Sequence, residues 1–316
     1  MKSSKADVEA RIHKIPRLRF TGKRKLTSYA GIVIFQALFA RLGLLSKLRA
    51  CVRHLAYRGT YGTGKILLLL IIHLLLGFRR LRGLDYYRAD PLVARVAHLK
   101  SLPDVATISR ALAECDDGVV ENLRDLNRTL VLDRIAAEKL SRVTLDFDGS
   151  VQSTKGHAEG TAVGFNKKKK GARSYYPLFA TVAQLDEFFD VLHRPGNVHD
   201  SNGAVLFMAD CIARIREGLG SQFRTMEARM DSAFYTDEIL GLLDEQHVDF
   251  TCSVPFERLH KLKGIVEERT AWSRINEKWS FFEVDWKPKR WDDRHRLVCL
   301  RSRRKVPIKG PLQLDL

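Results

Sequence analysis

The chain has 316 residues, 45% of them hydrophobic and 29% charged, which is enough apolar sequence to bury the cores of about two domains. This composition excludes a disordered basic tail. The 54 lysines and arginines outnumber the 37 acidic residues and give a net charge of +17, so phosphate backbones are favoured as partners over acidic small molecules. Nucleic acid is therefore the expected partner.

Residues 1–27 are predicted to form a flexible basic arm. Nine lysines and arginines within residues 1–25 stand against only Asp7 and Glu9, and the apolar residues there follow no regular spacing. Such a segment stays disordered until an anionic partner orders it.

Residues 28–140 are predicted to form an all-helical, DNA-binding domain. Apolar residues recur there at helical spacing, and glycines and prolines separate the pieces. The apolar run Ile66–Leu76 is too short to cross a bilayer and contains His73, so we expect a buried helix with a core histidine and no membrane partner. The predicted helices are Ile32–Leu42, Ser46–Tyr57, Gly64–Phe78, Pro91–Leu99, Thr107–Cys115 and Val119–Leu140.

Two interpretations remain open for residues 102–110 within this domain. Small polar residues and Arg110 near the start of a helix suit contacts in a DNA groove, which makes Arg110 a candidate DNA-binding residue. The same residues are equally typical of an ordinary capped helix.

Beyond Leu140 the pattern changes to strands, in the order β β β α β α β. This order predicts a five-stranded mixed sheet, with three strands joined by hairpins and two reached through helical crossovers. The first two strands are separated by a long polar connection. The predicted elements are the strands Val143–Asp148, Tyr176–Gln184, Phe188–His193, Arg224–Met230 and Asp249–Val254 and the helices Ser201–Leu219 and Thr236–Gln246.

The mixed sheet is assigned to a domain of residues 141–265, and an appended β element to residues 266–316. A helix over Phe256–Lys263 precedes the aromatic, strand-like part of this element. The five cysteines of the chain stand singly and no secretory leader is found, so neither a zinc ribbon nor a disulfide framework is predicted. A reducing cytoplasm is the expected compartment.

Acidic residues at the ends of two predicted strands are the candidates for chemistry. Asp146 and Asp148 lie two apart on one strand, so their side chains point the same way, and Asp231 ends another strand. If the two strands are neighbours, the carboxylates meet at one edge and can bind Mg²⁺ through oxygen ligands. Two such ions, roughly 3.5 to 4 Å apart, would activate a water or a 3′ hydroxyl and stabilise the leaving oxygen of a phosphodiester.

A simpler interpretation of the same acids remains open. Asp148 and Gly149 can form a turn, and Asp231 and Ser232 can cap a helix, because these residue types commonly do so. Spacing alone does not decide between a metal site and these local roles.

Five local motifs between about residues 100 and 255 strongly resemble the DDE transposases of bacterial insertion sequences. That family commonly shows Asp-x-Asp-Ser/Ala-Thr, Gly-Tyr-Asn-x-Lys-Lys-Gly and Tyr-His-Pro-Leu in this order, followed by Arg-x-Asp-Ser-Gly-Phe. The corresponding segments here are Asp148-Gly149-Ser150, Lys155 to Gly160, Gly164 to Gly171, Ser174 to Leu178 and Arg229 to Phe234.

The resemblance implies an RNase H-like catalytic domain in which Asp148 and Asp231 are the first and second catalytic acids and hold the metal. Asp146 is the alternative first acid, or else a residue that supports the metal ligands. The implied cofactor is Mg²⁺, with Mn²⁺ as a possible substitute. The implied partners are the terminal inverted repeats of the element and target DNA, bound as double-stranded DNA by a homodimer in the bacterial cytoplasm, at the nucleoid.

The lysine run in the segment Gly164 to Gly171 is expected to contact the phosphates of the element ends, whereas the alternative is a solvated loop. Arg173 and Tyr175, beside that run, are further candidate backbone contacts. The candidate lysines are Lys167, Lys168, Lys169 and Lys170.

The chain departs from the family at the third acid, a glutamate on a helix that follows the β insertion within a Tyr-x-x-x-Arg-x-x-x-x-Glu pattern. No such pattern is found, and the four nearby glutamates lie before or inside the β element, so we expect the chain to be truncated before this motif. The alternative function is then a catalytically inactive, DNA-binding transposase remnant; a general RNase H-like nuclease would need a third acid within the chain. The glutamates are Glu267, Glu268, Glu277 and Glu283.

Overall fold

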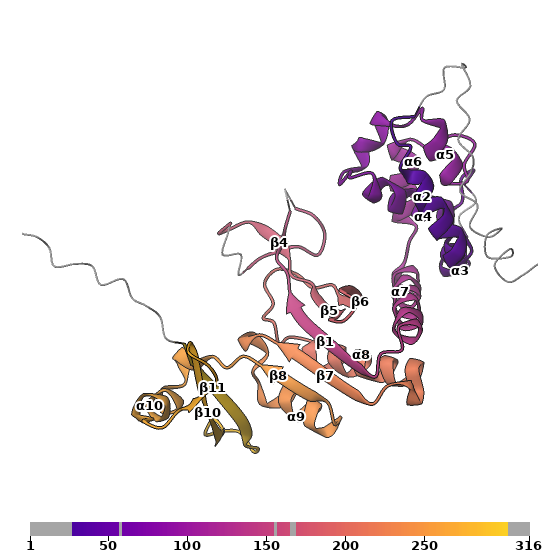
Figure 1. Cartoon of the computed structure of the whole chain (residues 1–316). Helices are drawn as coiled ribbons and strands as arrows, with labels where there is room; N and C mark the ends of the chain where they lie inside the picture. The colour runs from indigo at the N-terminus through magenta and orange to yellow at the C-terminus, as the bar shows by residue number, and fades with distance from the viewer. Residues whose placement is uncertain (1–26, 57–58, 155–156, 165–168, 303–316) are drawn as a thin grey trace, which may run out of the picture. The chain divides into compact units, whose positions relative to one another are not determined.

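The computed structural model describes residues 27–302 except 57–58, 155–156 and 165–168, and the chain divides into two compact units, Met1–Leu130 and Val131–Leu316 (Figure 1). Apart from Thr27, the predicted basic arm lies outside the described residues. The two units are described separately below.

The first unit is all-helical, as predicted. Its centre is α4, whose residues Ile66, Leu68, Leu69 and Ile72 are fully buried. The helix α2 ends where Gly43 adopts a left-handed backbone conformation with φ 59°, which glycine adopts without strain. The elements are α2 (Ile32–Leu42), α3 (Leu44–Cys51), α4 (Thr63–Leu75), η1 (Leu81–Tyr86), α5 (Pro91–Val96), α6 (Val105–Ala113) and α7 (Asp117–Ala137), which continues into the second unit.

The apolar run in α4 is a buried helix with a core histidine, as predicted. His73 is buried, its Nε2 donates to the carbonyl of Arg80 at 3.0 Å, and its Nδ1 lies 2.5 Å from the hydroxyl of Tyr87. A neutral imidazole with one donor and one acceptor nitrogen satisfies both contacts. None of the described helices is both long and apolar enough to cross a membrane.

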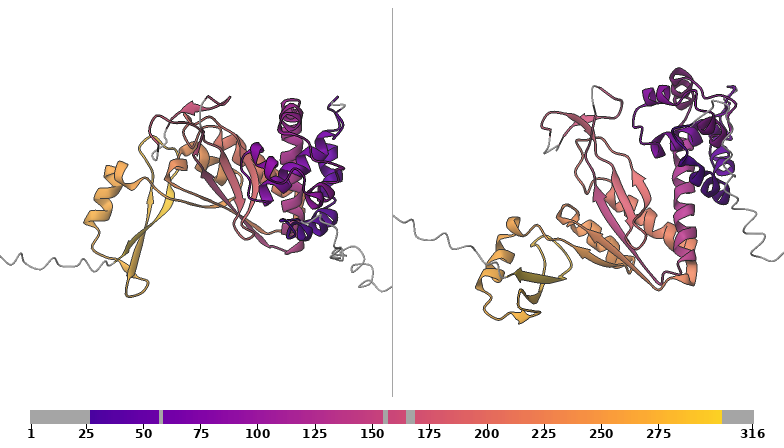
Figure 2. Two further views of the ribbon diagram at one scale, coloured as in Figure 1. Left: turned by 90° about the horizontal axis from the view of Figure 1, so that it is seen from above. Right: turned by 45° about the horizontal axis from the view of Figure 1, so that its top comes forward.

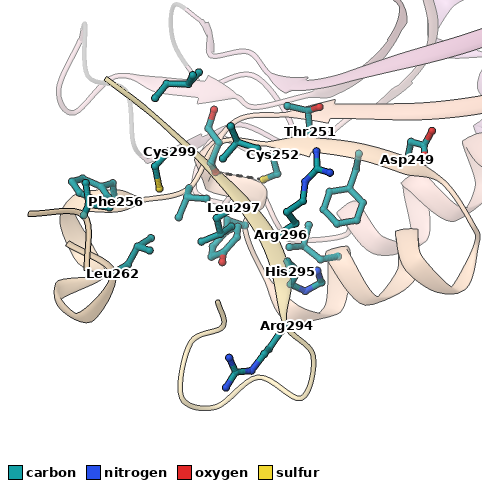
Figure 3. Close-up of a pocket in the computed structure, with 18 of the residues that line it drawn as sticks. Asp249, Thr251, Cys252, Phe256, Leu262, Arg294, His295, Arg296, Leu297 and Cys299 are labelled. Carbon is teal, nitrogen blue, oxygen red and sulfur yellow. Dashed lines mark hydrogen bonds between the residues drawn. The ribbon is translucent and has the colours of Figure 1, made fainter. Parts of the chain in front are cut away.

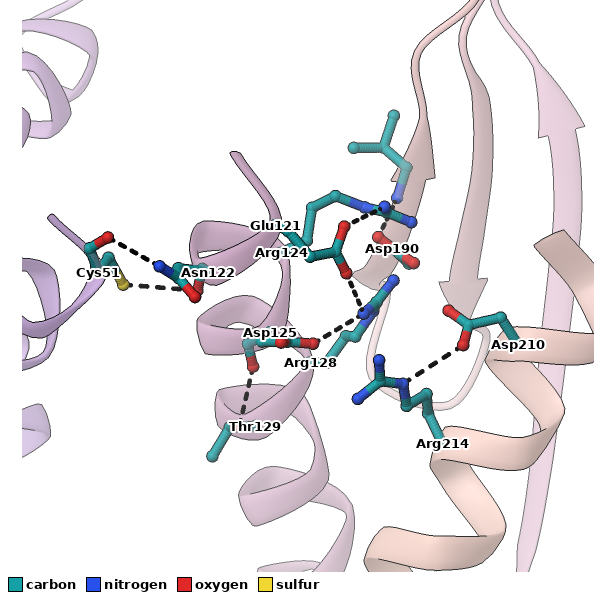
Figure 4. A network of polar contacts seen from close by, with 11 residues as sticks. Cys51, Glu121, Asn122, Arg124, Asp125, Arg128, Thr129, Asp190, Asp210 and Arg214 are labelled. Atoms are coloured by element: carbon teal, nitrogen blue, oxygen red, sulfur yellow. Dashed lines mark hydrogen bonds and ion pairs between the residues drawn. The ribbon is translucent and has the colours of Figure 1, made fainter. Parts of the chain in front are cut away.

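Charged residues one and two turns apart stabilise α7 (Figure 4). Glu121 accepts hydrogen bonds from Arg124 at 2.6 Å and from Arg128 at 3.0 Å, and Asp125 accepts one from Arg128 at 2.8 Å. Oppositely charged residues three apart, as in Arg124 with Glu121 and Arg128 with Asp125, support a helix. The amide of Asn122 donates to the carbonyl of Cys51 at 2.9 Å and joins α7 to α3.

The second unit is built on a five-stranded mixed sheet in the order β6-β5-β1-β7-β8, which confirms the predicted β β β α β α β arrangement (Figure 1). β1, β5 and β6 are antiparallel neighbours, and β1, β7 and β8 run parallel. The elements are β1 (Arg142–Gly149), β5 (Leu178–Val182), β6 (Glu187–Leu192), α8 (Ala204–Leu219), η2 (Gly220–Gln222), β7 (Thr225–Met230), η3 (Ser232–Phe234), α9 (Asp237–Glu245) and β8 (Asp249–Cys252).

The two faces of this sheet differ in chemistry. Val143, Leu145 and Phe147 of β1 are buried in the core that α8 and α9 form on one face. Because side chains alternate along a strand, the residues between them, including Asp146 and Asp148, lie on the opposite face. This alternation decides which side chains remain available for chemistry.

The polar connection predicted between the first two sheet strands contains three short strands of its own. They form a sheet in the order β2-β4-β3, and two or three residues are too few to show an alternating pattern. The strands are β2 (Gln152–Ser153), β3 (Ala162–Val163) and β4 (Arg173–Tyr175).

The appended β element is a three-stranded antiparallel sheet in the order β11-β10-β9 with one helix beside it (Figure 2). The helix predicted over Phe256–Lys263 is instead a single 3₁₀ turn followed by a helix that continues to Glu268. The elements are η4 (Phe256–Arg258), α10 (His260–Glu268), β9 (Ser273–Arg274), β10 (Trp279–Trp286) and β11 (His295–Ser302).

Phe147 is the residue of β1 whose truncation tests this core. It is fully buried and packs edge-on against Phe207 of α8, with 6.2 Å between the ring centroids. We expect Phe147→Ala to lower the free energy of unfolding by about 3–5 kcal/mol, through lost transfer energy and the cavity that remains. Leu206→Ala, on the exposed side of α8, should change it by less than about 0.5 kcal/mol. Equal losses in urea unfolding of the two variants would contradict this core assignment.

Candidate active site

On the face of β1 and β7 that points away from the core, two pairs of polar side chains hydrogen-bond to each other. Thr144 Oγ1 donates to Glu227 Oε2 at 2.9 Å, and Arg229 donates through Nε and a terminal nitrogen to the two carboxylate oxygens of Asp146 at 2.5 and 2.6 Å. The Arg229 pair is solvent-exposed on both sides, so it contributes roughly 0.2–1 kcal/mol. Both oxygens of Asp146 are therefore already used within the sheet.

The next position on this face brings two carboxylates together. Phe147 is paired with Met230 across the parallel strands, so the residues that follow them, Asp148 and Asp231, lie next to each other at the carboxyl ends of β1 and β7. Within the described part of the chain, neither of these carboxylates has an ion-pair partner. This pair therefore carries two negative charges without a neutralising cation.

The electrostatics of Asp148 reflect this arrangement. Its side chain is exposed, yet partial desolvation raises the pKa of Asp148, and the negative charges of Asp231 and Asp200 raise it further. A hydrogen bond from the backbone N–H of Gly149 opposes these effects. Binding a cation at this point would relieve the repulsion.

The local roles considered for these acids are realised in part. Asp148 lies inside β1 and not in a turn. Asp231 Oδ1 accepts the N–H of Ala233 at 2.8 Å and so caps the short helix η3. Among the described residues no donor contacts the second carboxylate oxygen of Asp231, which leaves it available to a ligand.

Asp200 is a third acid at this site that the sequence did not indicate. Its carboxylate accepts a hydrogen bond of 2.5 Å from the hydroxyl of Tyr176. Gly149 packs against both groups, because a Cβ there would lie 2.5 Å from Asp200 Oδ1 and 2.6 Å from the Tyr176 hydroxyl. Burial, and then the Asp200 hydrogen bond, raise the pKa of Tyr176, so it remains a donor.

Arg194 holds the loop that carries Asp200. It is 5% exposed, and one guanidinium nitrogen donates to the carbonyls of His199, Asp200 and Asn202 at 3.3, 2.9 and 2.7 Å. Its Nε donates to the carbonyl of Tyr176 at 3.0 Å. These bonds fix Asp200 and Tyr176 relative to each other. Tyr176 is distant along the chain from His199, Asp200 and Asn202, so only folding brings the four residues together.

Cys252 closes the site on the side of β8. Its thiol donates to the carbonyl of Asp231 at 3.4 Å. Burial, together with the nearby charge of Asp231, raises the pKa of Cys252 to about 12. The thiol therefore stays protonated at neutral pH and is no nucleophile.

The candidate DNA-binding residues lie in two places. Lys167 and Lys168 fall outside the described residues, and Lys169 and Lys170 precede β4. Arg173 donates to the hydroxyl of Thr161 at 2.9 Å and to its carbonyl, and Tyr175 donates to the carbonyl of Glu159 at 2.5 Å. These two side chains stiffen the sheet β2-β4-β3, and Lys169 and Lys170 directly precede the loop that leads into its strand β4.

Arg110 belongs to the first unit and lies on α6. Its guanidinium group folds back on its own helix, with hydrogen bonds to Thr107 Oγ1 at 3.2 Å and to the carbonyl of Ala106 at 3.4 Å. Asp104 caps this helix by accepting the N–H of Thr107 at 2.7 Å. The capped-helix geometry is thus present, and Arg110 is exposed on its surface.

A separate pocket of about 990 Å³ lies between β8 and β11 (Figure 3). Apolar residues line it together with Cys252, Cys299 and the arginines Arg294, Arg296 and Arg301. Neither Asp148 nor Asp231 is among its lining residues. The paired acids lie outside this pocket, at the carboxyl ends of β1 and β7, and both are exposed.

Residues 10–307 match the family described as transposase DDE domain group 1. The chain belongs to this transposase family. The match spans nearly the whole chain, including β1, β7 and both acids of the pair. No curated protein is similar enough to the chain to count as a match.

Solved transposase structures show weaker similarity. The piggyBac transposase synaptic complex with hairpin DNA is 11% identical with a TM-score of 0.36, over 84% of this chain and 60% of the other. The Drosophila P element transposase strand transfer complex is 13% identical with a TM-score of 0.31, over 71% and 48%. The chain thus spans 60% of the length of the piggyBac chain that it matches. The family assignment rests on the sequence match and not on these similarities.

DDE transposases generally use divalent metal ions, and the paired carboxylates suit such an ion. Among the described residues no group of three or more histidine, cysteine, aspartate and glutamate side chains is arranged to hold a metal. Mg²⁺, however, is commonly bound by one or two carboxylates together with water and substrate phosphates. Asp148 and Asp231 fit that kind of site because they are adjacent and exposed, and no cation in the described part of the chain pairs with them.

The raised pKa of Asp148 predicts a pH-dependent effect on stability. The folded state binds this proton more tightly than the unfolded state, so stability is lost as the pH rises from the ordinary value of 3.8 through the raised pKa. We expect Asp148→Asn, which carries no such charge, to melt at a higher temperature than the native chain at neutral pH, with the gain fading towards pH 3.5. The measurement is thermal unfolding with a chelator present, and Asp186→Asn, in the exposed β5–β6 turn, is the control. A gain independent of pH would rule out repulsion as its cause.

Proposed function

We propose that the chain is a transposase that binds the ends of an insertion sequence and catalyses metal-dependent DNA strand cleavage and transfer. The observation that carries this proposal is the parallel register of β1 and β7, which brings Asp148 beside Asp231 with no neutralising cation among the described residues. Membership of the DDE transposase family supplies the reaction class.

In this proposal Asp148 and Asp231 hold Mg²⁺, or Mn²⁺ in its place. The bound metal supplies Lewis-acid stabilisation of the phosphodiester and lowers the pKa of an attacking water or 3′ hydroxyl. The remaining oxygen of Asp231 and the exposed carboxylate of Asp148 are the groups available for it. Asp146 acts instead by holding Arg229 and so fixing the strands next to the pair.

DNA is the proposed partner because the chain carries a net charge of +17. Lys167, Lys168, Lys169 and Lys170 are proposed to contact phosphates of the terminal inverted repeats, supported by the sheet that Arg173 and Tyr175 stiffen. Cleavage at two element ends and joining to target DNA favours a homodimer on double-stranded DNA, acting in the cytoplasm.

A second candidate function is a remnant that binds the element ends without cutting them. The surroundings of Asp148 favour this second candidate. The acids whose negative charges raise the pKa of Asp148 are Asp231 and Asp200, and no glutamate is among them. Glu267 and Glu268 lie on α10, Glu277 between β9 and β10, and Glu283 on β10, all exposed.

One experiment separates the two candidates. DNA carrying the terminal repeats that flank the reading frame is incubated with the chain and Mg²⁺ or Mn²⁺, and binding and strand cleavage are measured on the same substrate. Binding with cleavage supports the transposase. Binding without cleavage in either metal supports the remnant, and neither binding nor cleavage contradicts both.

If the chain cuts, Asp148→Asn and Asp231→Asn should each lower the cleavage rate by at least about 100-fold, because loss of a group that only orients a metal ligand already costs roughly 10- to 100-fold. DNA binding should persist, since neither residue is basic. Asp186→Asn removes one charge at the opposite end of β1 and should cut normally. Asp146→Asn should lose less than the paired acids, and a loss as large would make Asp146 the first catalytic acid instead.

A further inference from the structure

An exposed aromatic stack stands at the turn after α4 in the helical unit. Phe78 lies between His73 and Tyr86, with ring centroids 5.4 Å from the histidine and 5.8 Å from the tyrosine. The rings of Phe78 and Tyr86 are nearly parallel, at 9°. Tyr86 is 80% exposed, so one of its faces rests on Phe78 and the other is open to solvent.

This stack is held rigidly from beneath. His73 donates to the carbonyl of Arg80 and bonds the hydroxyl of the buried Tyr87, which fixes both ends of the turn. Gly83 packs so closely that a Cβ there would lie 2.6 Å from the Phe78 ring. A ligand that stacks on Tyr86 therefore meets a surface that is already ordered, which reduces the entropic cost of binding.

Three arginines surround the stack. Arg79, Arg80 and Arg82 are exposed, and within the described residues no ion pair or hydrogen bond occupies their guanidinium groups. Together with Phe78, Asp85 and Tyr86 they line an open hollow of about 720 Å³. Asp85 offsets one of the three charges, so the hollow remains cationic. We call these arginines and Tyr86 the arginine–tyrosine surface.

A neighbouring helix carries a further arginine. The helix α6 packs against η1, which carries Arg82 and Tyr86. Arg110 is exposed on α6, where its guanidinium group bonds Thr107 and the carbonyl of Ala106.

We infer that the arginine–tyrosine surface binds DNA, with the arginines on backbone phosphates and the open face of Tyr86 stacked on an unpaired base. The inference rests on the proposed function, because it takes DNA as the partner. A flat aromatic face can stack on a base, and arginines beside it suit the adjoining phosphates. A DNA end or a locally opened duplex supplies such a base.

The test measures binding of fluorescent DNA to the full chain by anisotropy, using a fully paired duplex and the same duplex with a short single-stranded extension. The native chain should prefer the extended DNA. Tyr86→Ala should weaken binding of the extended DNA by roughly 5- to 150-fold and leave the paired duplex nearly unchanged. Tyr86→Phe keeps the ring and should bind as the native chain does, which separates stacking from a structural role.

The arginines are tested by the salt dependence of binding. The double variant Arg79→Gln and Arg82→Gln should reduce the slope of log affinity against log salt by about 1.4 to 1.8, because each lost phosphate contact accounts for about 0.7 to 0.9. Arg41→Gln removes an exposed charge of α2 outside the hollow and should change the slope by less than half as much as the double variant does. Circular dichroism of every variant checks that the helical unit is intact.

Several outcomes would overturn the inference. Unchanged binding of extended DNA by Tyr86→Ala removes the stacking role, and an unchanged salt slope in the arginine variant removes the phosphate contacts. Loss of binding to anionic vesicles, with DNA binding intact, would assign the surface to a membrane instead. If the native chain binds and cuts DNA while these variants match it, the inference alone fails; if the native chain neither binds nor cuts, the proposed function fails as well.

Discussion

The parallel register between β1 and β7 is the constraint on which the rest of the structure depends. It pairs Asp146 with Arg229, and the next position on the same face carries Asp148 and Asp231. The pair of Asp146 with Arg229 has no net charge, and the pair of Asp148 with Asp231 is doubly negative. The two pairs are only two residues apart along each strand. A shift of one residue would turn the acids towards the core and expose Leu145 and Phe147 in their place, so core packing and the carboxylate pair are set by the same register.

Repulsion at such a pair disfavours the folded state, and the surrounding structure holds it in place. The core on the other face of β1 anchors the strand through side chains that are fully buried. Arg194 and Tyr176 fix the loop with Asp200 close to Asp148, and Gly149 allows that approach because it has no side chain. Unfavourable interactions such as this repulsion are typical of functional sites, where a bound ligand and not the protein relieves them.

Most of the fold was predictable because it depends on local patterns. Alternation in β1 and helical periodicity in α8 are visible over eight and sixteen residues, and the strand and helix order then restricts the sheet to few topologies. The strands β2, β3 and β4 were missed because two or three residues carry no period. The helix predicted over Phe256–Lys263 was misplaced because a 3₁₀ turn and an α-helix show the same apolar spacing over so few residues.

The sequence by itself determined the helical unit, the mixed sheet and the acids at the ends of two strands, since each follows from a pattern among residues that are neighbours in the chain. Only the tertiary structure decided that Arg229 pairs with Asp146, that Asp200 approaches Asp148, and that Tyr86 is exposed next to exposed arginines. These contacts join residues that are distant along the chain or face solvent, so no local period records them. Their geometry follows from strand register and loop closure, which exist only once the core has packed.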